Sequence, residues 1–348
     1  RNERIESVRI TRGSNLRNLS REYPYLKSET FCPEVFFRTL VGEYDVVHCF
    51  PALNKNNMMA LAAARLRRIP IFMSNFDLVD YVSLLDRGLP IRTILDNLRI
   101  SSKQAYFLAK FNAIFTISNR ETCLIKAANP NTFLSTVPIL LEEFEAEVDI
   151  KEFKNAYGIH PDVPVVLCLG RVVRIKGQDI LLKALPQLRE KVDKFKVLFV
   201  GRTDYEPEYM REMQAFIEQE GLQEHVTFTG GVPRKDVIGA LKACDVHVLP
   251  VRFMNSGAVV IETWAAGKPV LQSDMIDPCY VVEGENGFTF SVDDPRDLSD
   301  KLLRILASTE LSQRMGANGR SLVERKFLYP QLIRQYLDAY RKYGNVDV

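Results

Sequence analysis

The sequence predicts an α/β protein with two doubly wound parallel sheets. Short apolar runs alternate with stretches of about 10 to 15 residues that carry apolar side chains at helical spacing. The alternation pauses at an acidic run near residue 145 and then starts again. A chain of 348 residues is long enough for two such units. Ligands of such sheets bind at the carboxyl ends of the strands, so we expect a site in a cleft between two domains.

We expect a first domain at residues 1–145, a second at 146–330, and a C-terminal helix at 331–348 that could cross back to the first domain. Apolar runs predict strands of the first domain at 5–10, 44–50, 69–74, 113–117 and 136–141. Helical spacing predicts helices at 33–41, 57–67, 101–110 and 120–128. The glutamates of 142–147 are expected to form a linker.

The second domain repeats the pattern with clearer boundaries. Its predicted strands are 163–169, 195–201, 226–230, 246–249, 269–271 and 287–290. Its predicted helices are 152–157, 177–192, 208–220, 235–243, 258–266, 295–307 and 310–327, with a last helix at 331–343. Pro250 removes a backbone donor and should end one strand, and Gly267 suits the left-handed residue after a helix.

Composition limits the classes of function. Hydrophobic residues make up 46% of the chain and charged residues 26%, which is typical of a globular protein. The net charge of +2 argues against a dedicated nucleic-acid-binding protein. Residues 1–130 carry 19 Lys and Arg against 12 Asp and Glu, an excess of 7. Solvated faces explain this excess, and the alternative is a basic first domain that contacts an anionic membrane or an anionic acceptor.

The six cysteines are scattered and include no Cys-x-x-Cys pair. This usage is typical of reduced thiols in a cytoplasmic protein rather than of disulfides or a zinc site. No run of 18 apolar residues predicts a membrane span. We therefore expect a cytoplasmic protein, with peripheral contact at the inner face of the membrane as an option. The chain begins with Arg1 rather than Met, so we expect that residues precede it.

One stretch of the second domain combines a strand, a loop and the start of a helix. After Pro250 the loop ends in Asn255, Ser256 and Gly257, and a helix is predicted from Ala258. Asn255 or Ser256 can cap this helix. Free backbone N–H groups and the helix dipole at such a start suit a phosphate or diphosphate. Taken alone, the pattern is equally typical of an ordinary strand–loop–helix unit.

A second stretch places cations after the carboxyl end of a predicted strand. The strand ends at Gly170, and Arg171, Arg174 and Lys176 follow before the next helix. Arg offers a planar fork and Lys a point charge, and both suit a diphosphate. We interpret Arg174 as a solvated loop charge.

Ordered motifs in the second domain resemble those of retaining glycosyltransferases of family 4, which have the GT-B fold of two Rossmann-like domains. The motifs are GRVVRIKGQDILLKAL (170–185), VLFVGR (197–202), VTFTGGVPRKDVIGALKACDVHVLP (226–250), SGAVVIETWAAGKPVLQS (256–273) and GENGFTF (284–290). The resemblance implies a nucleotide-sugar donor on the second domain, an acceptor on the first, and no metal. The first domain resembles the family only loosely.

The resemblance implies roles for individual residues. Arg171 and Lys176 match the Arg and Lys that grip the donor diphosphate and would stabilise its charge as it leaves. Glu262 matches the second Glu of the family's Glu-x7-Glu motif, which binds the ribose hydroxyls. Further donor-binding positions are the strand end at Gly170, the base-contacting Val232, the loop residues Asn255 and Ser256, and the backbone amides of Gly257 and Ala258.

Two departures from the family concern the donor sugar and the acceptor side. Met254 replaces the first Glu of the motif, and a thioether cannot accept the hydrogen bonds of sugar hydroxyls. Asn255 is the nearest side chain that could do so. The strand near 69–78 lacks the family's His, so His48, at the end of its own predicted strand, is the remaining candidate for a catalytic His. A structural role for His48 is the favoured alternative.

The resemblance therefore implies a metal-independent, retaining glycosyltransferase without a cofactor. UDP- and GDP-sugars are the expected donors, and the acceptor hydroxyl belongs to a saccharide, a lipid-linked molecule or a small molecule. Two alternatives remain. Met254 and the missing His would also suit a catalytically impaired accessory subunit that binds nucleotide sugars. A nucleotide-sugar epimerase is disfavoured because carboxylates and histidines do not cluster in the sequence.

Overall fold

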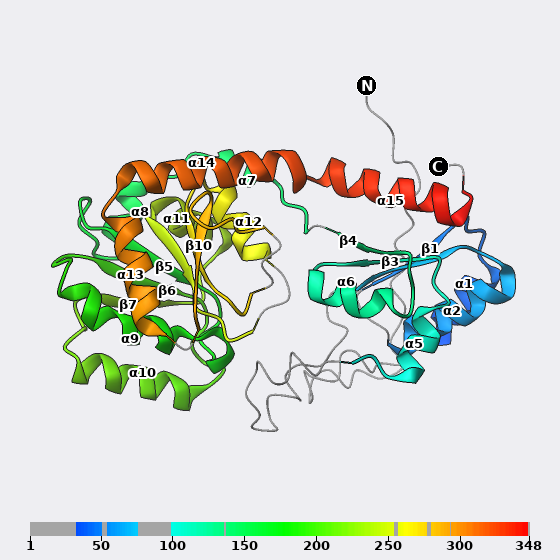
Figure 1. Cartoon of the computed structure of the whole chain (residues 1–348), viewed down its shortest axis with the longest axis horizontal. Helices are drawn as coiled ribbons and strands as arrows, with labels where there is room; N and C mark the ends of the chain where they lie inside the picture. Colours follow the sequence, from blue (N-terminus) through cyan, green and yellow to red (C-terminus); the bar gives the residue numbers. More distant parts are fainter. Residues whose placement is uncertain are drawn as a thin grey trace.

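The computed structural model describes residues 33–50, 54–75, 99–135, 137–253, 257–276, 280–292 and 294–346. These residues form two α/β lobes that lie side by side, with two consecutive helices running along one side of both (Figure 1). The two parallel sheets and the acidic connection between them agree with the fold class predicted from the sequence. The predicted strand 5–10 lies outside the described residues.

The first lobe contains a four-stranded parallel sheet in the order β1-β2-β3-β4. The strands are β1 (Val47–Cys49), β2 (Ile71–Asn75), β3 (Ala113–Thr116) and β4 (Thr132–Leu134). The helices are α1 (Pro33–Val41), α2 (Lys55–Arg67), α5 (Ser102–Leu108) and α6 (Asn119–Lys126). Every residue of β3 is buried, as expected for an inner strand with helices on both faces.

The strand predicted at 136–141 is wrong. The strand that pairs with β3 is β4, which ends at Leu134, and the following segment leaves the sheet. Ile139 instead forms an isolated bridge with Leu328, after the last helix of the second lobe. Ile139 is buried, and Val137 and Leu141 are partly buried, against the second lobe rather than in the first sheet. The hydrophobicity of the segment alone was therefore misleading.

The second lobe contains a six-stranded parallel sheet in the order β10-β9-β8-β5-β6-β7. Its strands are β5 (Val165–Leu169), β6 (Lys196–Val200), β7 (Val226–Gly230), β8 (Val246–Leu249), β9 (Val270–Ser273) and β10 (Gly287–Phe290). The chain proceeds outward from β5 to β7 and then returns to β8 on the other side of β5. The strand order therefore reverses between β5 and β8, and a ligand site is expected at their carboxyl ends.

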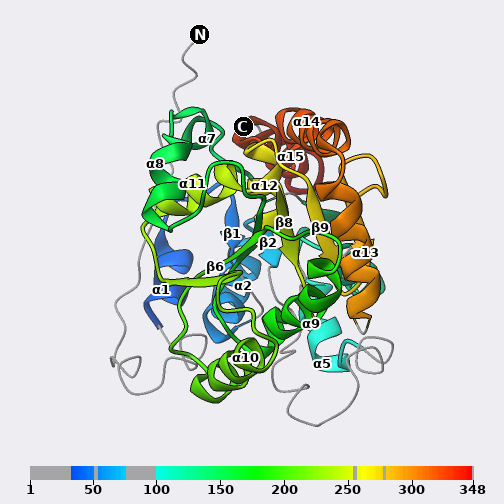
Figure 2. The same ribbon diagram turned by 90° about the vertical axis from the view of Figure 1, so that its left-hand side faces the viewer.

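Helices cover both faces of this sheet (Figure 2). The first group is α9 (Gln178–Arg189), α10 (Pro207–Gln219) and α13 (Pro295–Leu306), whose apolar residues share one core cluster. The second group is α8 (Ile150–Ala156), α11 (Arg234–Ala243) and α12 (Ala258–Ala265), which pack on the opposite face. The acidic linker forms the short helix α7 (Glu142–Glu145).

Helix α14 (Thr309–Lys326) is fixed to the second lobe through Trp264. The indole is fully buried, and its Nε1 donates a hydrogen bond to the carbonyl of Asn286 at 2.9 Å. Gly319 packs directly against the same ring. A Cβ atom added at this position would lie only 2.1 Å from Trp264 Cδ1. Trp264 is therefore a core residue, and the turn at Asn286 is structural, because the Asn286 side chain also accepts a hydrogen bond from the Val282 amide.

Helix α15 (Tyr329–Gly344) continues from α14 and lies along the first lobe (Figure 1). Tyr336 and Tyr340 on this helix contact the first sheet, where the Tyr336 hydroxyl lies 2.9 Å from Ser74 Oγ. Asn112 Nδ2 donates to the carbonyl of Tyr343 at 2.8 Å. The end of the chain therefore joins the two lobes.

Replacing Gly319 with Val should destabilise the fold by about 1–3 kcal/mol, because the new side chain would overlap the Trp264 indole. The matched control is Ala317→Val, an exposed position on the same helix, which should change the stability by about 0.5 kcal/mol or less. Chemical denaturation of both variants measures the difference. Equal stabilities would show that the helix can move away from the ring at little cost.

Acidification should destabilise the protein through His247 on β8. Burial lowers the pKa of His247 from its usual 6.5 to about 3, because the ring is fully enclosed. Its Nε2 accepts a hydrogen bond from the Leu169 amide, and Nδ1 faces the Thr263 hydroxyl, which itself donates to the Val259 carbonyl. Both contacts suit the neutral ring.

In the unfolded chain His247 binds a proton as the pH falls through about 6.5, whereas in the folded protein it stays neutral. The free energy of unfolding is therefore highest above pH 6.5 and falls as the pH decreases. His247→Gln should therefore lose about 2 kcal/mol less unfolding free energy than the wild type between pH 7 and pH 5. The exposed His160 provides the control, since His160→Gln should keep the full pH-dependent loss. An identical loss in His247→Gln and the wild type would contradict the assignment.

Candidate functional site

The candidate site lies where the strand order of the second sheet reverses. The loops that follow β5 and β8 meet there, and the loops after β6 and β7 continue the same edge. The first lobe reaches this edge, because the guanidinium of Arg120, after β3, lies 5.7 Å from the ring centroid of Phe253, after β8. The carboxyl edges of both sheets therefore adjoin at this point.

Two glycines set the backbone at the ends of β5 and β6. Gly170 and Gly201 both have a φ of +147°, which disfavours other residues. A Cβ atom on Gly201 would lie 2.1 Å from the carbonyl oxygen of Gly170. The amide of Val172 donates to the carbonyl of Arg202 at 2.8 Å. This close approach places Arg171 and Arg202 on neighbouring loops.

The turn that carries Lys176 is a single 3-10 turn, Arg174–Lys176, closed by Gly177. Gly177 has a φ of +68°, and a Cβ atom there would lie 1.9 Å from the carbonyl oxygen of Pro250. Only glycine allows the loop after β5 to touch the loop after β8 in this way. The sequence suggested a glycine that opens a helix, and the structure shows that it also brings the two loops into contact.

Arg171 and Lys176 follow β5 at this edge, and no carboxylate partner is found for either among the described residues. Their neighbours are paired: Arg174 with Glu212, Arg202 with Asp204 and Arg252 with Asp179. Burial lowers the pKa of Lys176, and the nearby charge of Arg171 lowers this pKa further. An anion between the two side chains would remove this repulsion, as a diphosphate does.

Arg171 is held by an aromatic face instead of a carboxylate. Its guanidinium lies 5.0 Å from the ring centroid of Tyr205, and Arg202 lies 4.8 Å from the same centroid. A cation over an aromatic ring is attracted by the ring's electrons, and its N–H groups remain available at the edge. Tyr205 was not a sequence candidate, because no spacing rule relates it to Arg171.

Glu262 lies on α12, with an exposed side-chain fraction of 23%. Its Oε1 accepts a hydrogen bond from Arg234 Nη1 at 2.7 Å. Arg234 also contacts Glu143 Oε2 of the linker helix through Nε and Nη2, both at 3.0 Å. The described part of the chain provides no hydrogen bond to Oε2 of Glu262. Sequence reasoning missed Arg234, whose partners are distant in the chain.

The remaining donor-site candidates lie at the same edge or outside the described residues. Helix α12 begins at Ala258, with Gly257 as the preceding residue, as the sequence predicts. Val232 follows β7, and its partly buried side chain packs against the core. Asn255 and Ser256, together with Met254, lie outside the described residues, so the replaced Glu position is not placed.

His48 lies on β1, in the first lobe, among aromatic side chains. Its Nε2 lies 2.9 Å from Ser74 Oγ, and its Nδ1 contacts the hydroxyl of Tyr340 on α15. Burial lowers the pKa of His48 to about 3. A neutral ring with both nitrogens engaged favours the structural alternative over the catalytic one. The structure does not bring His48 into contact with Arg171 or Lys176.

The part of the chain described by the structure offers no group of three or more His, Cys, Asp or Glu that could hold a metal ion. None of its helices is both long enough and apolar enough to cross a membrane. Four cysteines fall in the described ranges and are free thiols, namely Cys49, Cys123, Cys168 and Cys244.

Curated relatives match about half of the chain. A GDP-mannose-dependent alpha-(1-6)-phosphatidylinositol monomannoside mannosyltransferase from Mycolicibacterium smegmatis is 30% identical over 205 residues, covering 56% of this chain and 52% of that protein. A phosphatidyl-myo-inositol mannosyltransferase from Mycobacterium leprae is 34% identical over 177 residues, covering 49% and 46%. The chain thus spans about half the length of the curated relatives it matches.

Solved structures share the fold over most of the chain. HepE from Anabaena, solved in complex with UDP, superposes with a TM-score of 0.72 at 20% identity, covering 88% of this chain and 81% of that one. Sucrose-phosphate synthase from Thermosynechococcus elongatus gives a TM-score of 0.69 at 22% identity, covering 88% and 75%. These likenesses confirm the GT-B architecture predicted from the sequence.

The family model described as glycosyl transferases group 1 matches residues 149–322. This range contains the loops after β5, β6, β7 and β8, and therefore the whole edge that carries Arg171, Lys176 and Glu262. The chain belongs to the glycosyl transferases group 1 family.

Proposed function

We propose that this chain transfers a sugar from a nucleoside diphosphate sugar to a hydroxyl acceptor, with retention at the anomeric carbon and without a metal. The observation that carries the proposal is the pair Arg171 and Lys176, two neighbouring cations without a carboxylate partner in the described structure, at the strand-order reversal. The neighbouring arginines Arg174, Arg202 and Arg252 are already neutralised by carboxylates. The edge is thus prepared for an anionic ligand.

The proposed reaction needs charge stabilisation more than a protein nucleophile. The bond between the anomeric carbon and the diphosphate oxygen breaks, and the acceptor oxygen bonds to the same face of that carbon. The acceptor's hydroxyl proton passes to an oxygen of the departing phosphate. Arg171 and Lys176 would stabilise the charge that grows on the diphosphate. Electrostatic stabilisation of this kind is usually the largest single contribution to an enzyme's rate enhancement. The amides at the start of α12 would add to this stabilisation.

The ribose and the base would be bound by neighbouring loops. Glu262 would accept hydrogen bonds from ribose hydroxyls through Oε2, while Arg234 holds Oε1. Val232, in the loop after β7, would contact the base. HepE, solved with UDP, and relatives named as GDP-mannose-dependent support UDP and GDP as the nucleotides to be tested.

A lipid-linked acceptor is the proposed partner among the alternatives left open by the sequence. The curated relatives named above act on phosphatidylinositol derivatives. The end of α2 would suit contact with an anionic membrane surface, because Arg65, Arg67 and Arg68 surround Leu66, whose exposed fraction is 71%.

Lys176→Ala should lower turnover by about 10²–10³-fold, because removing one charge-stabilising group from the leaving diphosphate raises the barrier. The melting temperature should remain unchanged. Release of UDP or GDP from a panel of UDP- and GDP-sugars measures turnover, and Lys191→Ala, at an exposed position near the end of α9, is the control. Unchanged turnover in Lys176→Ala would rule out the proposed role.

Glu262→Gln should weaken the binding of a ribonucleotide about tenfold or more, because a hydrogen bond to a charged group is worth about 1.5–3 kcal/mol. The 2′,3′-dideoxy form of the same nucleotide should bind the variant and the wild type equally. Calorimetry with UDP or GDP and the matching dideoxy nucleotide tests this. Glu218→Gln, at an exposed position of α10, is the control, and equal weakening of both nucleotides would exclude a ribose contact.

The accessory-subunit alternative makes a different prediction. It requires nucleotide binding with neither hydrolysis nor transfer of any donor sugar, and Met254 is the residue that motivates it. The same calorimetry and donor-hydrolysis assays on the unaltered chain distinguish the two functions.

A further inference from the structure

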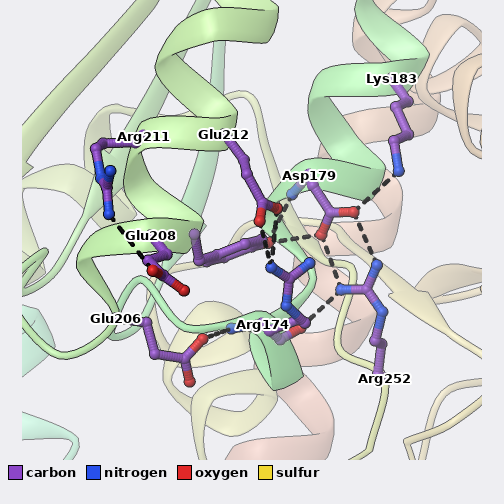
Figure 3. Close-up of polar contacts among 9 residues, drawn as sticks. Arg174, Asp179, Lys183, Glu206, Glu208, Arg211, Glu212 and Arg252 are labelled. Carbon is purple, nitrogen blue, oxygen red and sulfur yellow. Dashed lines mark hydrogen bonds and ion pairs between the residues drawn. The ribbon is translucent and has the colours of Figure 1, made fainter.

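We propose that Asp179 and Arg252 are positioning residues that hold Lys176 in place for the donor diphosphate. This inference rests on the proposed function, since it assumes that Lys176 binds the diphosphate. Neither residue was a candidate from the sequence. Asp179 lies in the first turn of α9, and Arg252 lies in the loop after β8, so the pair joins the two loops between which the strand order reverses (Figure 3).

The contact between the two side chains is bidentate. Arg252 Nη1 donates to Asp179 Oδ1 and Nη2 donates to Oδ2, both at 2.8 Å. The exposed fractions of the side chains are 26% for Arg252 and 15% for Asp179. A bidentate pair with this degree of burial is stronger and geometrically more specific than an exposed ion pair.

Arg252 also binds the backbone of the turn that carries Lys176. Its Nη1 donates to the carbonyl of Arg174 at 2.7 Å, and its own amide donates to the carbonyl of Ile175 at 2.9 Å. These are the two carbonyls immediately before Lys176. Because Gly177 touches the Pro250 carbonyl on the other side, the Lys176 backbone is fixed at both flanks to the loop after β8.

Asp179 is itself held in one orientation by Tyr209 of α10. The Tyr209 hydroxyl donates to Asp179 Oδ1 at 2.6 Å and accepts from the Asp179 amide at 2.9 Å. Burial acts to raise the pKa of Asp179, but the hydrogen bonds from Arg252 and Tyr209 outweigh it and hold the pKa well below its usual range. The carboxylate therefore stays charged.

Lys176 has no carboxylate to fix its side chain among the described residues, so its position depends on the backbone of the turn. A lysine ammonium acts as a point charge on a flexible stem, and its energy of interaction with a diphosphate falls as the distance grows. Loosening the turn should therefore weaken the attraction between Lys176 and the diphosphate, although the charge of Lys176 remains. This is the effect that separates a positioning role from a general stabilising role.

Other ion pairs near the turn are more exposed. The pair Arg174–Glu212 has exposed side-chain fractions of 53% and 59%, and the pair Arg211–Glu208 has 72% and 87% (Figure 3). Exposed ion pairs of this kind contribute little to the stability of the fold. Arg211–Glu208 lies on α10, near Tyr209 in sequence, and makes no described contact with the turn, so it provides the control.

The test measures how much tighter a nucleoside diphosphate binds than the monophosphate of the same nucleoside. UDP and UMP are the probes, or GDP and GMP where these bind more tightly. Arg252→Lys keeps the charge but lacks the fork, and Asp179→Asn keeps the shape but lacks the charge. Each should reduce the diphosphate-to-monophosphate affinity ratio about fivefold or more, with monophosphate affinity unchanged.

A double-mutant cycle shows whether Arg252 acts through Lys176. Lys176→Met alone should remove most of the preference for the diphosphate over the monophosphate. Adding Arg252→Lys should reduce the affinity ratio no further, because the two residues act on one contact. Glu208→Gln should leave the ratio unchanged. Where Arg252→Lys and Asp179→Asn fail to fold by circular dichroism, Tyr209→Phe, which removes only the hydroxyl that orients Asp179, gives the same readout.

The outcomes separate the two claims. A ratio reduced by Lys176→Met but not by Arg252→Lys or Asp179→Asn overturns this inference and leaves the proposed function standing. Full additivity of Lys176→Met and Arg252→Lys overturns it as well, since the residues would then act independently. A ratio that does not respond to Lys176→Met overturns the proposed function itself.

Discussion

The geometry of the candidate site depends on one backbone contact, in which Gly177 lies against the carbonyl of Pro250. This contact is possible because Gly177 has a positive φ and no Cβ atom. It joins the loop after β5 to the loop after β8, where the strand order reverses. The bidentate Asp179–Arg252 pair reinforces the same junction. Two rigidly connected loops can present Lys176 and the start of α12 to one ligand at a fixed separation.

The charges at this junction are distributed unevenly. Arginines in structural roles are matched with carboxylates, whereas Arg171 rests on the ring of Tyr205 and Lys176 has no described acidic partner. Unpaired like charges in proximity are unfavourable for the empty protein. A bound diphosphate would attract both cations and offset this repulsion. The same pair of charges that destabilises the ligand-free protein would therefore stabilise the complex.

The connection between the lobes reaches the site through Glu262. Arg234 binds Glu262 on α12 and Glu143 on the linker helix α7, so the proposed ribose contact shares its arginine with the interlobe connection. At the other end of the molecule, Tyr336 and Tyr340 of α15 contact Ser74 and His48 of the first sheet. These contacts give His48 a structural environment.

The sequence was sufficient for the fold class, for most strands, and for bringing the candidate cations to one edge of the second sheet. Strand-and-helix periodicity, together with the glycines at 170 and 177, predicted the loops correctly because these signals are local. The segment at 136–141 was assigned to the wrong element, since its apolar residues pack on the second lobe. Arg234, Tyr205 and the Asp179–Arg252 pair were missed for a related reason. Their partners are distant in the sequence, and no periodicity records such contacts.

The central claim is that Arg171 and Lys176 bind the diphosphate of a nucleotide sugar. A structure of the chain with UDP or GDP bound tests it most directly. The account predicts the diphosphate within hydrogen-bond distance of both cations and the ribose at Oε2 of Glu262. A nucleotide whose diphosphate lies away from both cations, with Lys176 facing solvent, would contradict it.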